Sequence, residues 1–518
     1  MMDEGRMAEW HLSFSATPAT MEFGSALRVL DGYMEAIAPT LTQLDGVAQT
    51  LTPLKFEAAN AFLNEIAAGA GMELDQVRYA VCLFAVYPLA LLFQLLPTAT
   101  LKHLYSLGVG VSLAQFVFGS QWVHSFLMSF LTYLLVWLAP AKFAPSIVFL
   151  FNMTYMSLAH LYRIYVDYMG WSLDFTGPQM LLVIKLTAFA YNYYDGVVDI
   201  KRLNSPTDNK GLARVYASRK ALSVSKMPSL LEFFAYVYCF TTFLAGPAFE
   251  LREYLDVVNG AKRLGPGRFL ATISKFVVGV TFMGLMVAFG GAYPITMLYS
   301  DEVAALPHFE RILQLYICLF FVKAKYYGAW KISEGATVLC GFGFEGFAAD
   351  GASKGWNGVS NMDVLGFELA PSIREGSRAW NKGTQAWLER YVYSRTGNSL
   401  MATYFVSAFW HGFYPGYYIF FMSIPLPTAV NRVAFKRIRP YFLEADGSFG
   451  AKKRVYDVIG TICTIFTLHY LVIPFQALSW EHSLAALTHM KFSGHIIMAV
   501  LYVVFSLVPM RKLKTKQQ

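Results

Sequence analysis

The chain has 518 residues, of which 56% are hydrophobic, 16% are aromatic and only 15% are charged. Soluble domains carry about 25% charged residues, so this composition excludes a pair of ordinary soluble domains and indicates a polytopic membrane protein. The net charge of +8 is explained by basic cytoplasmic loops, and we predict no nucleic-acid partner. The five cysteines lack metal-type spacing and predict neither a disulfide framework nor a zinc site.

The first part of the chain, residues 1–74, is moderately polar and lacks the pattern of a cleaved signal peptide. We predict cytosolic or interfacial helices there, followed by a membrane-embedded domain over residues 75–510. Apolar windows of about twenty residues, enough to cross roughly 30 Å of hydrocarbon, recur along this domain. They predict an all-α fold with about eleven spans. The windows are 77–96, 104–118, 122–138, 146–162, 180–194, 230–248, 273–298, 309–327, 400–422, 455–478 and 496–508.

Basic residues predict the side of the membrane that two segments face. Segment 201–226 carries seven lysines and arginines, which indicates a cytoplasmic loop. The tail, 511–518, is also basic, and its Lys514 and Lys516 have the spacing of a dilysine retrieval signal. Charge alone would also place this tail inside. We therefore predict an endoplasmic reticulum membrane protein with a cytosolic C-terminus.

Segment 331–396 is rich in glycine and tryptophan, yet apolar windows precede and follow it. Irregular backbone at membrane depth is tolerated only when it packs inside protein or lines a wet cavity. Residues 341–346 match the dinucleotide pattern GxGxxG without a βαβ unit, and residues 351–355 match GxSxG without a hydrolase sheet. Neither dinucleotide binding nor serine-hydrolase chemistry is therefore predicted.

His411 is the first candidate for chemistry, because ionisable groups inside apolar segments are costly and often functional. His160 and His469 also lie in apolar runs, and a structural hydrogen-bonding role is common for such histidines. His411 differs in its setting, since Trp410 and a glycine flank it. Three tyrosines follow closely and offer polar groups: Tyr414, Tyr417 and Tyr418.

Asn381 is the second candidate, thirty residues before His411. Trp380, Asn381, Thr384 and Trp387 have the spacing of one helical face, an apolar and aromatic surface with one embedded amide. An interfacial aromatic belt is the alternative interpretation, but it would not need the amide. A neutral imidazole could take a proton from a hydroxyl while the carboxamide polarises a carbonyl. This pairing predicts acyl transfer inside a membrane.

These elements resemble the membrane-bound O-acyltransferase (MBOAT) family, specifically its lysophospholipid acyltransferase branch. That branch shows WN-x-x-T-x-x-W-L, present at 380–388, and W-H-G followed by P-G-Y-Y, present at 410–418. The resemblance covers roughly residues 95–430. Further matching runs are 174–180, 185–187, 195–196, 228–233, 244–250, 325–330 and 341–344, together with Asn192 and Glu334.

The resemblance implies acyl-CoA-dependent acylation of a lysophospholipid hydroxyl, at the sn-2 position, by a helical bundle around a buried reaction chamber. It implies His411 as the general base and Asn381 as the group that polarises the thioester. It also implies three partners: acyl-CoA as co-substrate, a lysophospholipid and the surrounding membrane lipid. No metal and no cofactor are expected, and the oligomeric state stays open, with a homodimer as one option.

Six further residues are predicted to line the substrate path: Trp380, Thr384, Trp387, Arg390, Trp410 and Tyr417. Arg390, Lys382 and Arg395 could meet CoA phosphates at the cytosolic mouth, or could simply anchor the chain at the membrane surface. The head group of the lipid is not predicted. The alternatives are a related acyltransferase acting on diacylglycerol, a sterol or a protein, and a membrane transporter, although no internal repeat supports inverted halves.

Overall fold

The computed structural model describes residues 55–511 except 171, 172, 263 and 445, together with a few positions between 32 and 52. Helices dominate, and over these residues β-structure is limited to one isolated bridge between Phe347 and Ser353. The predicted all-α fold is therefore confirmed. Most of the predicted interfacial segment before residue 57 and the lysines of the tail lie outside the described residues.

The helices fall into three groups along the chain. The first comprises α2 (Glu57–Ala70), α3 (Leu74–Leu95), α4 (Ala99–Phe118), α5 (Trp122–Leu138), α6 (Ala144–Val166), α7 (Thr176–Val197), α8 (Ile200–Leu203), α9 (Lys210–Leu222), α10 (Leu230–Val237) and α11 (Leu251–Val258). The second comprises α12 (Arg268–Phe289), α13 (Asp301–Ala305), α14 (His308–Leu339), α15 (Val364–Glu368), α16 (Ile373–Ala379) and α17 (Lys382–Trp387). The third comprises α18 (Leu400–His411), α19 (Pro415–Ser423), α20 (Pro425–Val433), α21 (Ala451–Ala477), α22 (Trp480–His489) and α23 (Ser493–Leu507).

Short 3-10 and π-helical turns join several of these helices. They are η2 (Gly119–Gln121), η3 (Gly290–Ala292), η4 (Ile295–Tyr299), η5 (Leu388–Val392), η6 (Tyr393–Arg395), η7 (Ala434–Ile438) and η8 (Arg439–Phe442). Because η2 directly joins α4 and α5, the two windows predicted at 104–118 and 122–138 form one helical stretch.

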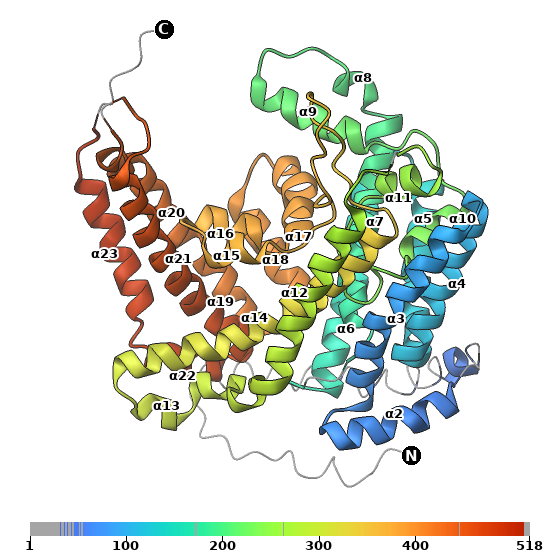
Figure 1. The fold of residues 1–518 in the computed structure, drawn as a ribbon, viewed down its shortest axis with the longest axis horizontal. Coiled ribbons are helices and arrows are strands. Elements are labelled where there is room, and N and C mark those ends of the chain that lie inside the picture. The colour runs from blue at the N-terminus through green and yellow to red at the C-terminus, as the bar shows by residue number, and fades with distance from the viewer. Residues whose placement is uncertain are drawn as a thin grey trace.

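The first helices and the last helices occupy opposite sides of the molecule, with α14 running between them (Figure 1). Helix α14 packs against α12 and also contacts α3 on one side and α21 on the other. One hydrophobic core includes Phe93, Phe189 and Trp410, while a second includes Leu319 and Tyr470. The segment that carries Asn381 and His411 contributes Trp387 and Trp410 to the first of these two cores.

Among the described residues, four helical stretches are long and apolar enough to cross a membrane, or up to five if one bent pair is a single span. They are Leu74–Leu95, Ala99–Leu138, Arg268–Ala292 and Ala451–Ala477, with the bent pair Trp480–His489 and Ser493–Leu507. The expected count of about eleven is not confirmed. Helix α7, which contains the predicted span 180–194, is not among these stretches. Its buried Lys185 and Asp195 lower its mean hydropathy.

The predicted span 230–248 is wrong. Helix α10 ends at Val237, and the buried Lys185 ammonium donates to the carbonyl oxygens of Tyr236 and Val237 at 2.5 and 3.3 Å. A cation at a helix C-terminus satisfies carbonyl groups that no longer have partners within the helix. The following residues are not α-helical, and Phe240 and Phe243 are buried. This apolar run therefore faces protein and not lipid.

The predicted span 400–422 is also broken. Helix α18 ends at His411, Gly412 adopts φ 122°, and α19 begins at Pro415. A side-chain carbon at position 412 would lie 3.2 Å from the His160 ring, so the close approach of that ring requires glycine. The break places His411 at a helix end, where its side chain meets residues from several elements.

Candidate active site

The His411 imidazole lies among aromatic side chains. The ring centroids of Trp410, Tyr417, Phe421 and Phe475 are 4.7, 5.6, 5.3 and 5.0 Å from that of His411. His411 is partly exposed, and over the part of the chain that the structure describes its ring nitrogens make no hydrogen bond. A neutral imidazole in this setting has a lone pair available to a hydroxyl group that enters from outside.

The two other histidines in apolar runs, His160 and His469, each have a ring nitrogen hydrogen-bonded to a backbone carbonyl group. His160 is buried, and its Nε2 donates to the carbonyl oxygen of Trp410 at 3.2 Å. His469 donates from Nδ1 to the Ile465 carbonyl oxygen of its own helix at 2.7 Å, and its ring centroid is 4.7 Å from that of Tyr316. His160 therefore supports the end of α18, while His469 contributes to packing between α14 and α21.

Asn381 immediately precedes α17 and adopts the left-handed conformation, with φ 43° and ψ 53°. This conformation costs an ordinary residue roughly 1–2 kcal/mol, and asparagine is one of the few that visit it routinely. The Asn381 side chain makes no capping hydrogen bond to the helix. The predicted helical face is partly wrong, because Trp380 is extended and precedes the helix, whereas Thr384 and Trp387 lie within it.

The segments that carry Asn381 and His411 contact each other through two tryptophans. The Trp387 and Trp410 ring centroids are 6.1 Å apart. Trp387 Nε1 donates to Thr187 Oγ1 at 2.8 Å, and Trp410 Nε1 donates to the Met180 carbonyl oxygen at 3.0 Å. Both segments are thereby anchored on α7. Since a helix rises 1.5 Å per residue, Asn381 lies about 9 Å along α17 from this contact.

The remaining predicted lining residues lie in different places. The Trp380 ring packs on α14, with its centroid 6.0 Å from that of Tyr326 and 5.4 Å from that of Trp330. Thr384 is buried in α17. Tyr417 lies beside the His411 ring. The structure thus gathers Trp387, Trp410 and Tyr417 near His411 and places Trp380 against a different helix.

The two arginines that follow the Asn381 motif are paired with carboxylates. Arg390 Nη1 lies 3.0 Å from Glu250 Oε1, and its side chain is 37% exposed. Arg395 and Arg219 lie 2.8 and 2.5 Å from the buried Asp195 carboxylate. Arg395 is therefore engaged internally, whereas Arg390 retains some access to solvent. Glu250 and Asp195 were visible in the sequence as members of matching motifs, without any signal of their pairing.

We expect Asp195→Ala to lower the free energy of unfolding by about 3–5 kcal/mol, because it removes the carboxylate partner of the Arg395 guanidinium and leaves Arg219 paired with Asp199 alone. Arg219 and Arg395 are 12% and 17% exposed. A matched control is Asp256→Ala, since the Arg252–Asp256 pair is 48% and 34% exposed. Such a surface pair contributes about 0–1 kcal/mol. Unfolding in detergent should separate the two variants, and equal losses would contradict the interpretation.

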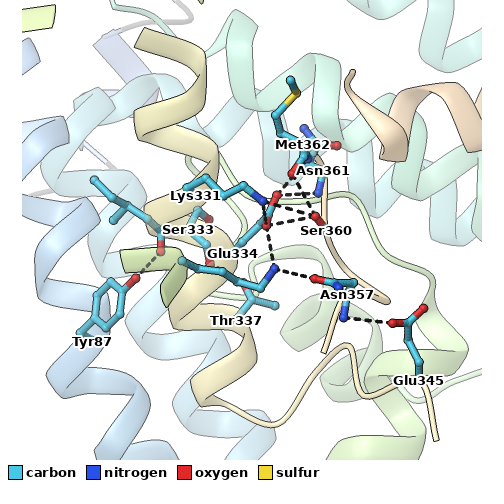
Figure 2. Close-up of polar contacts among 12 residues, drawn as sticks. Tyr87, Lys331, Ser333, Glu334, Thr337, Glu345, Asn357, Ser360, Asn361 and Met362 are labelled. Carbon is cyan, nitrogen blue, oxygen red and sulfur yellow. Dashed lines mark hydrogen bonds and ion pairs between the residues drawn. The ribbon is translucent and has the colours of Figure 1, made fainter. Parts of the chain in front are cut away.

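Glu334 organises a buried network beside Asn381. It is 0% exposed and points from α14 toward the loop that contains Ser360, Asn361 and Met362 (Figure 2). Its Oε2 accepts from Lys275 Nζ, Lys331 Nζ and Ser360 Oγ at 3.1, 2.7 and 3.2 Å, and its Oε1 accepts from the backbone N–H groups of Asn361 and Met362 at 2.7 and 3.0 Å. Motif matching flagged Glu334 without indicating this role.

The observed arrangement defines a class of protein. It is an all-helical membrane protein in which an imidazole and a carboxamide are held at helix ends among aromatic side chains. The model of the membrane-bound O-acyltransferase (MBOAT) family matches residues 160–473, a range that contains Asn381, His411 and Glu334. The chain belongs to this family and is a multi-pass membrane protein.

Curated relatives extend over most of the chain. The lysophospholipid acyltransferase of Schizosaccharomyces pombe is 30% identical over 491 residues, covering 90% of this chain and 92% of the relative. That of Saccharomyces cerevisiae is 30% identical over 485 residues, covering 87% and 77%. Human membrane-bound glycerophospholipid O-acyltransferase 2 is 28% identical over 471 residues, covering 86% and 87%. The predicted resemblance is confirmed, and it covers more of the chain than the motifs do.

Proposed function

We propose that this protein transfers the acyl group of acyl-CoA to the free sn-2 hydroxyl of a lysophospholipid. Support comes from relatives named lysophospholipid acyltransferase, which are 30% identical over most of the chain. The observation that carries the chemistry is the His411 imidazole, whose nitrogens are uncommitted among the described residues and whose helix contacts the one that follows Asn381.

In the proposed reaction, His411 accepts the hydroxyl proton while the alcohol oxygen attacks the thioester carbonyl carbon. The oxygen of the tetrahedral intermediate accepts a hydrogen bond from the Asn381 amide. The carbon–sulfur bond then breaks, and the CoA thiolate takes the proton from the imidazolium. General-base catalysis contributes about 10²–10⁴-fold and an oxyanion donor about 10²–10³-fold. The thioester is already activated, so the scheme needs no metal, cofactor or acyl-enzyme.

A substrate panel tests this proposal. Detergent-purified protein is given acyl-CoA with lysolipids that carry choline, ethanolamine, serine or inositol, or with diacylglycerol or a sterol. We expect free CoA thiol to appear only with lysolipids, and His411→Ala protein at equal concentration serves as the control. Thiol release with diacylglycerol or sterol but with no lysolipid would assign another acceptor. A folded protein that is inactive with every acceptor would contradict the enzymatic proposal.

We further propose an endoplasmic reticulum location, with the C-terminal tail and residues 201–226 in the cytosol. Helices α8 and α9, which carry much of the basic charge, contact each other and α7 at one end of the molecule, and α13 lies at the opposite end (Figure 1). The positive-inside bias then orients the chain.

We expect Lys210→Cys in α9 to react with a membrane-impermeant maleimide in sealed microsomes, because this exposed position would face the cytosol. The background variant would lack the five native cysteines, all of which are free thiols. Glu302→Cys in α13 is the matched position, since it is also exposed. It should react only after detergent is added. The reverse labelling pattern would invert the proposed orientation.

A further inference from the structure

We infer that Asn361, held by Glu334, caps helix α17 in place of Asn381 and thereby leaves the Asn381 amide free for the substrate. Glu334 and Asn361 are in this view positioning residues, and neither touches the reacting atoms. The inference rests on the proposed function, in which the Asn381 amide contacts the thioester carbonyl.

The first step is that Glu334 holds the loop around Asn361 rigidly. Its fully buried carboxylate accepts the five hydrogen bonds described above, including those from the ammonium groups of Lys275 and Lys331. These two lysines come from α12 and α14. A buried carboxylate is stable only while such partners are present, so rotation or displacement of this group is costly. The backbone of Asn361 and Met362 is therefore held at a constant position relative to α14.

The second step is that Asn361 supplies the cap. Its backbone carbonyl oxygen accepts from the Lys382 N–H at 2.7 Å, and its Oδ1 accepts from the Gly383 N–H at 3.0 Å. These are the first two N–H groups of α17, which have no partners within the helix. Normally the residue that precedes a helix caps the second or third of them with its own side chain. Asparagine is a favoured capping residue, yet Asn381 makes no such bond.

The third step concerns the glycine at position 383. A side-chain carbon added there would lie 3.0 Å from Asn361 Oδ1 and 3.3 Å from the Ala248 carbonyl oxygen. Gly383 therefore permits the Asn361 carboxamide to reach the helix. Without this external cap the Gly383 N–H would have no partner. Asn381 would then be drawn toward the extended backbone that side-chain capping uses, and capping would compete with substrate binding.

A double-mutant cycle tests the inference. Asn361→Ala should lower kcat at least about tenfold with little change in the KM for acyl-CoA, since a misplacement of 1 Å can cost about 10²-fold. In the Asn381→Ala background the same substitution should have no further effect on kcat. Asn361→Asp keeps an acceptor oxygen and should retain more kcat than Asn361→Ala. A merely structural role would multiply the two losses.

Two further variants test the same contact by changing the residues that bond Asn361. Gly383→Ala and Glu334→Gln should each lower kcat in the wild-type background. In the Asn381→Ala background neither substitution should lower kcat further. The matched control is Glu253→Gln, because Glu253 also holds a loop by accepting from the Gly343 N–H at 3.0 Å and pairs with Lys262 at 2.6 Å. This control should leave kcat unchanged. If Glu334→Gln fails to fold, the Asn361 and Gly383 variants still decide the question.

The outcomes separate this inference from the proposed function. Full activity of Asn381→Ala would refute the catalytic role of the amide itself. Loss of activity in Asn381→Ala, combined with a fully active Asn361→Ala or with multiplicative losses, would overturn only the capping inference. An equal loss in Glu253→Gln would also overturn it, because loosening any buried loop would then suffice.

Discussion

His411→Ala is expected to lower kcat by at least about 10²-fold, because it removes the group that we propose accepts the hydroxyl proton. The His411 ring makes aromatic contacts but no hydrogen bond within the described residues, so its loss should not unfold the protein. Turnover is measured as free CoA thiol at saturating acyl-CoA and lysolipid, with thermal unfolding in detergent recorded in parallel.

His469→Gln is a suitable comparison for this variant. His469 is also a histidine in an apolar run, but it is buried, its Nδ1 donates to the Ile465 carbonyl oxygen and its ring packs beside Tyr316. We expect this variant to keep activity close to that of the wild type. If His411→Ala retained more than about a tenth of the wild-type rate, a general-base role would be refuted, since that role is worth at least about 10²-fold.

Asn381→Ala is expected to lower kcat about 10²-fold with little change in the KM for acyl-CoA, because an oxyanion donor acts in the transition state. Steady-state kinetics with varied acyl-CoA separates the two constants. A variant whose only defect is a higher KM would assign Asn381 to substrate binding. Asn381→Asp should also fail, since a carboxylate would repel the developing negative charge.

Asn381→Gly separates the amide from the backbone conformation. Asn381 has φ 43°, a region that glycine enters more readily than any other residue. Asn381→Gly should therefore be at least as stable as Asn381→Ala while losing as much activity. A glycine variant with wild-type kcat would show that position 381 supplies only backbone geometry and that the amide is not needed.

Hydropathy predicted helices well where one side of the helix is exposed. The windows 77–96 and 455–478 correspond to α3 and α21, and exposed residues of α21 include Val458 and Ile462. The same measure was wrong at 230–248, where the apolar side chains are buried in protein. Hydropathy reports only how strongly a segment avoids water. Apolar side chains leave water equally well by facing lipid or by packing inside protein, so hydropathy does not distinguish the two.

Local motifs supplied the candidates for the catalytic residues but not how the structure holds them. Asn381 and His411 are candidates because of their surroundings in the sequence. The predicted helical face is correct for Thr384 and Trp387 but wrong for Trp380, which precedes the helix. The spacing of side chains implies a face only if the backbone is helical throughout. Asn381 interrupts that regularity by entering the left-handed region, as residues before a helix can do.

By itself the sequence determined that this is an all-helical membrane protein and pointed to the two segments that we propose carry its chemistry, because composition and short motifs are properties of the chain. Only the tertiary structure decided that Asn361 bonds Gly383 and that Glu334 bonds the Asn361 backbone, across 22 and 27 residues of sequence. Such contacts depend on how α12, α14 and α17 pack together. Packing arises from many distant side chains at once, so no local pattern along the chain reports it.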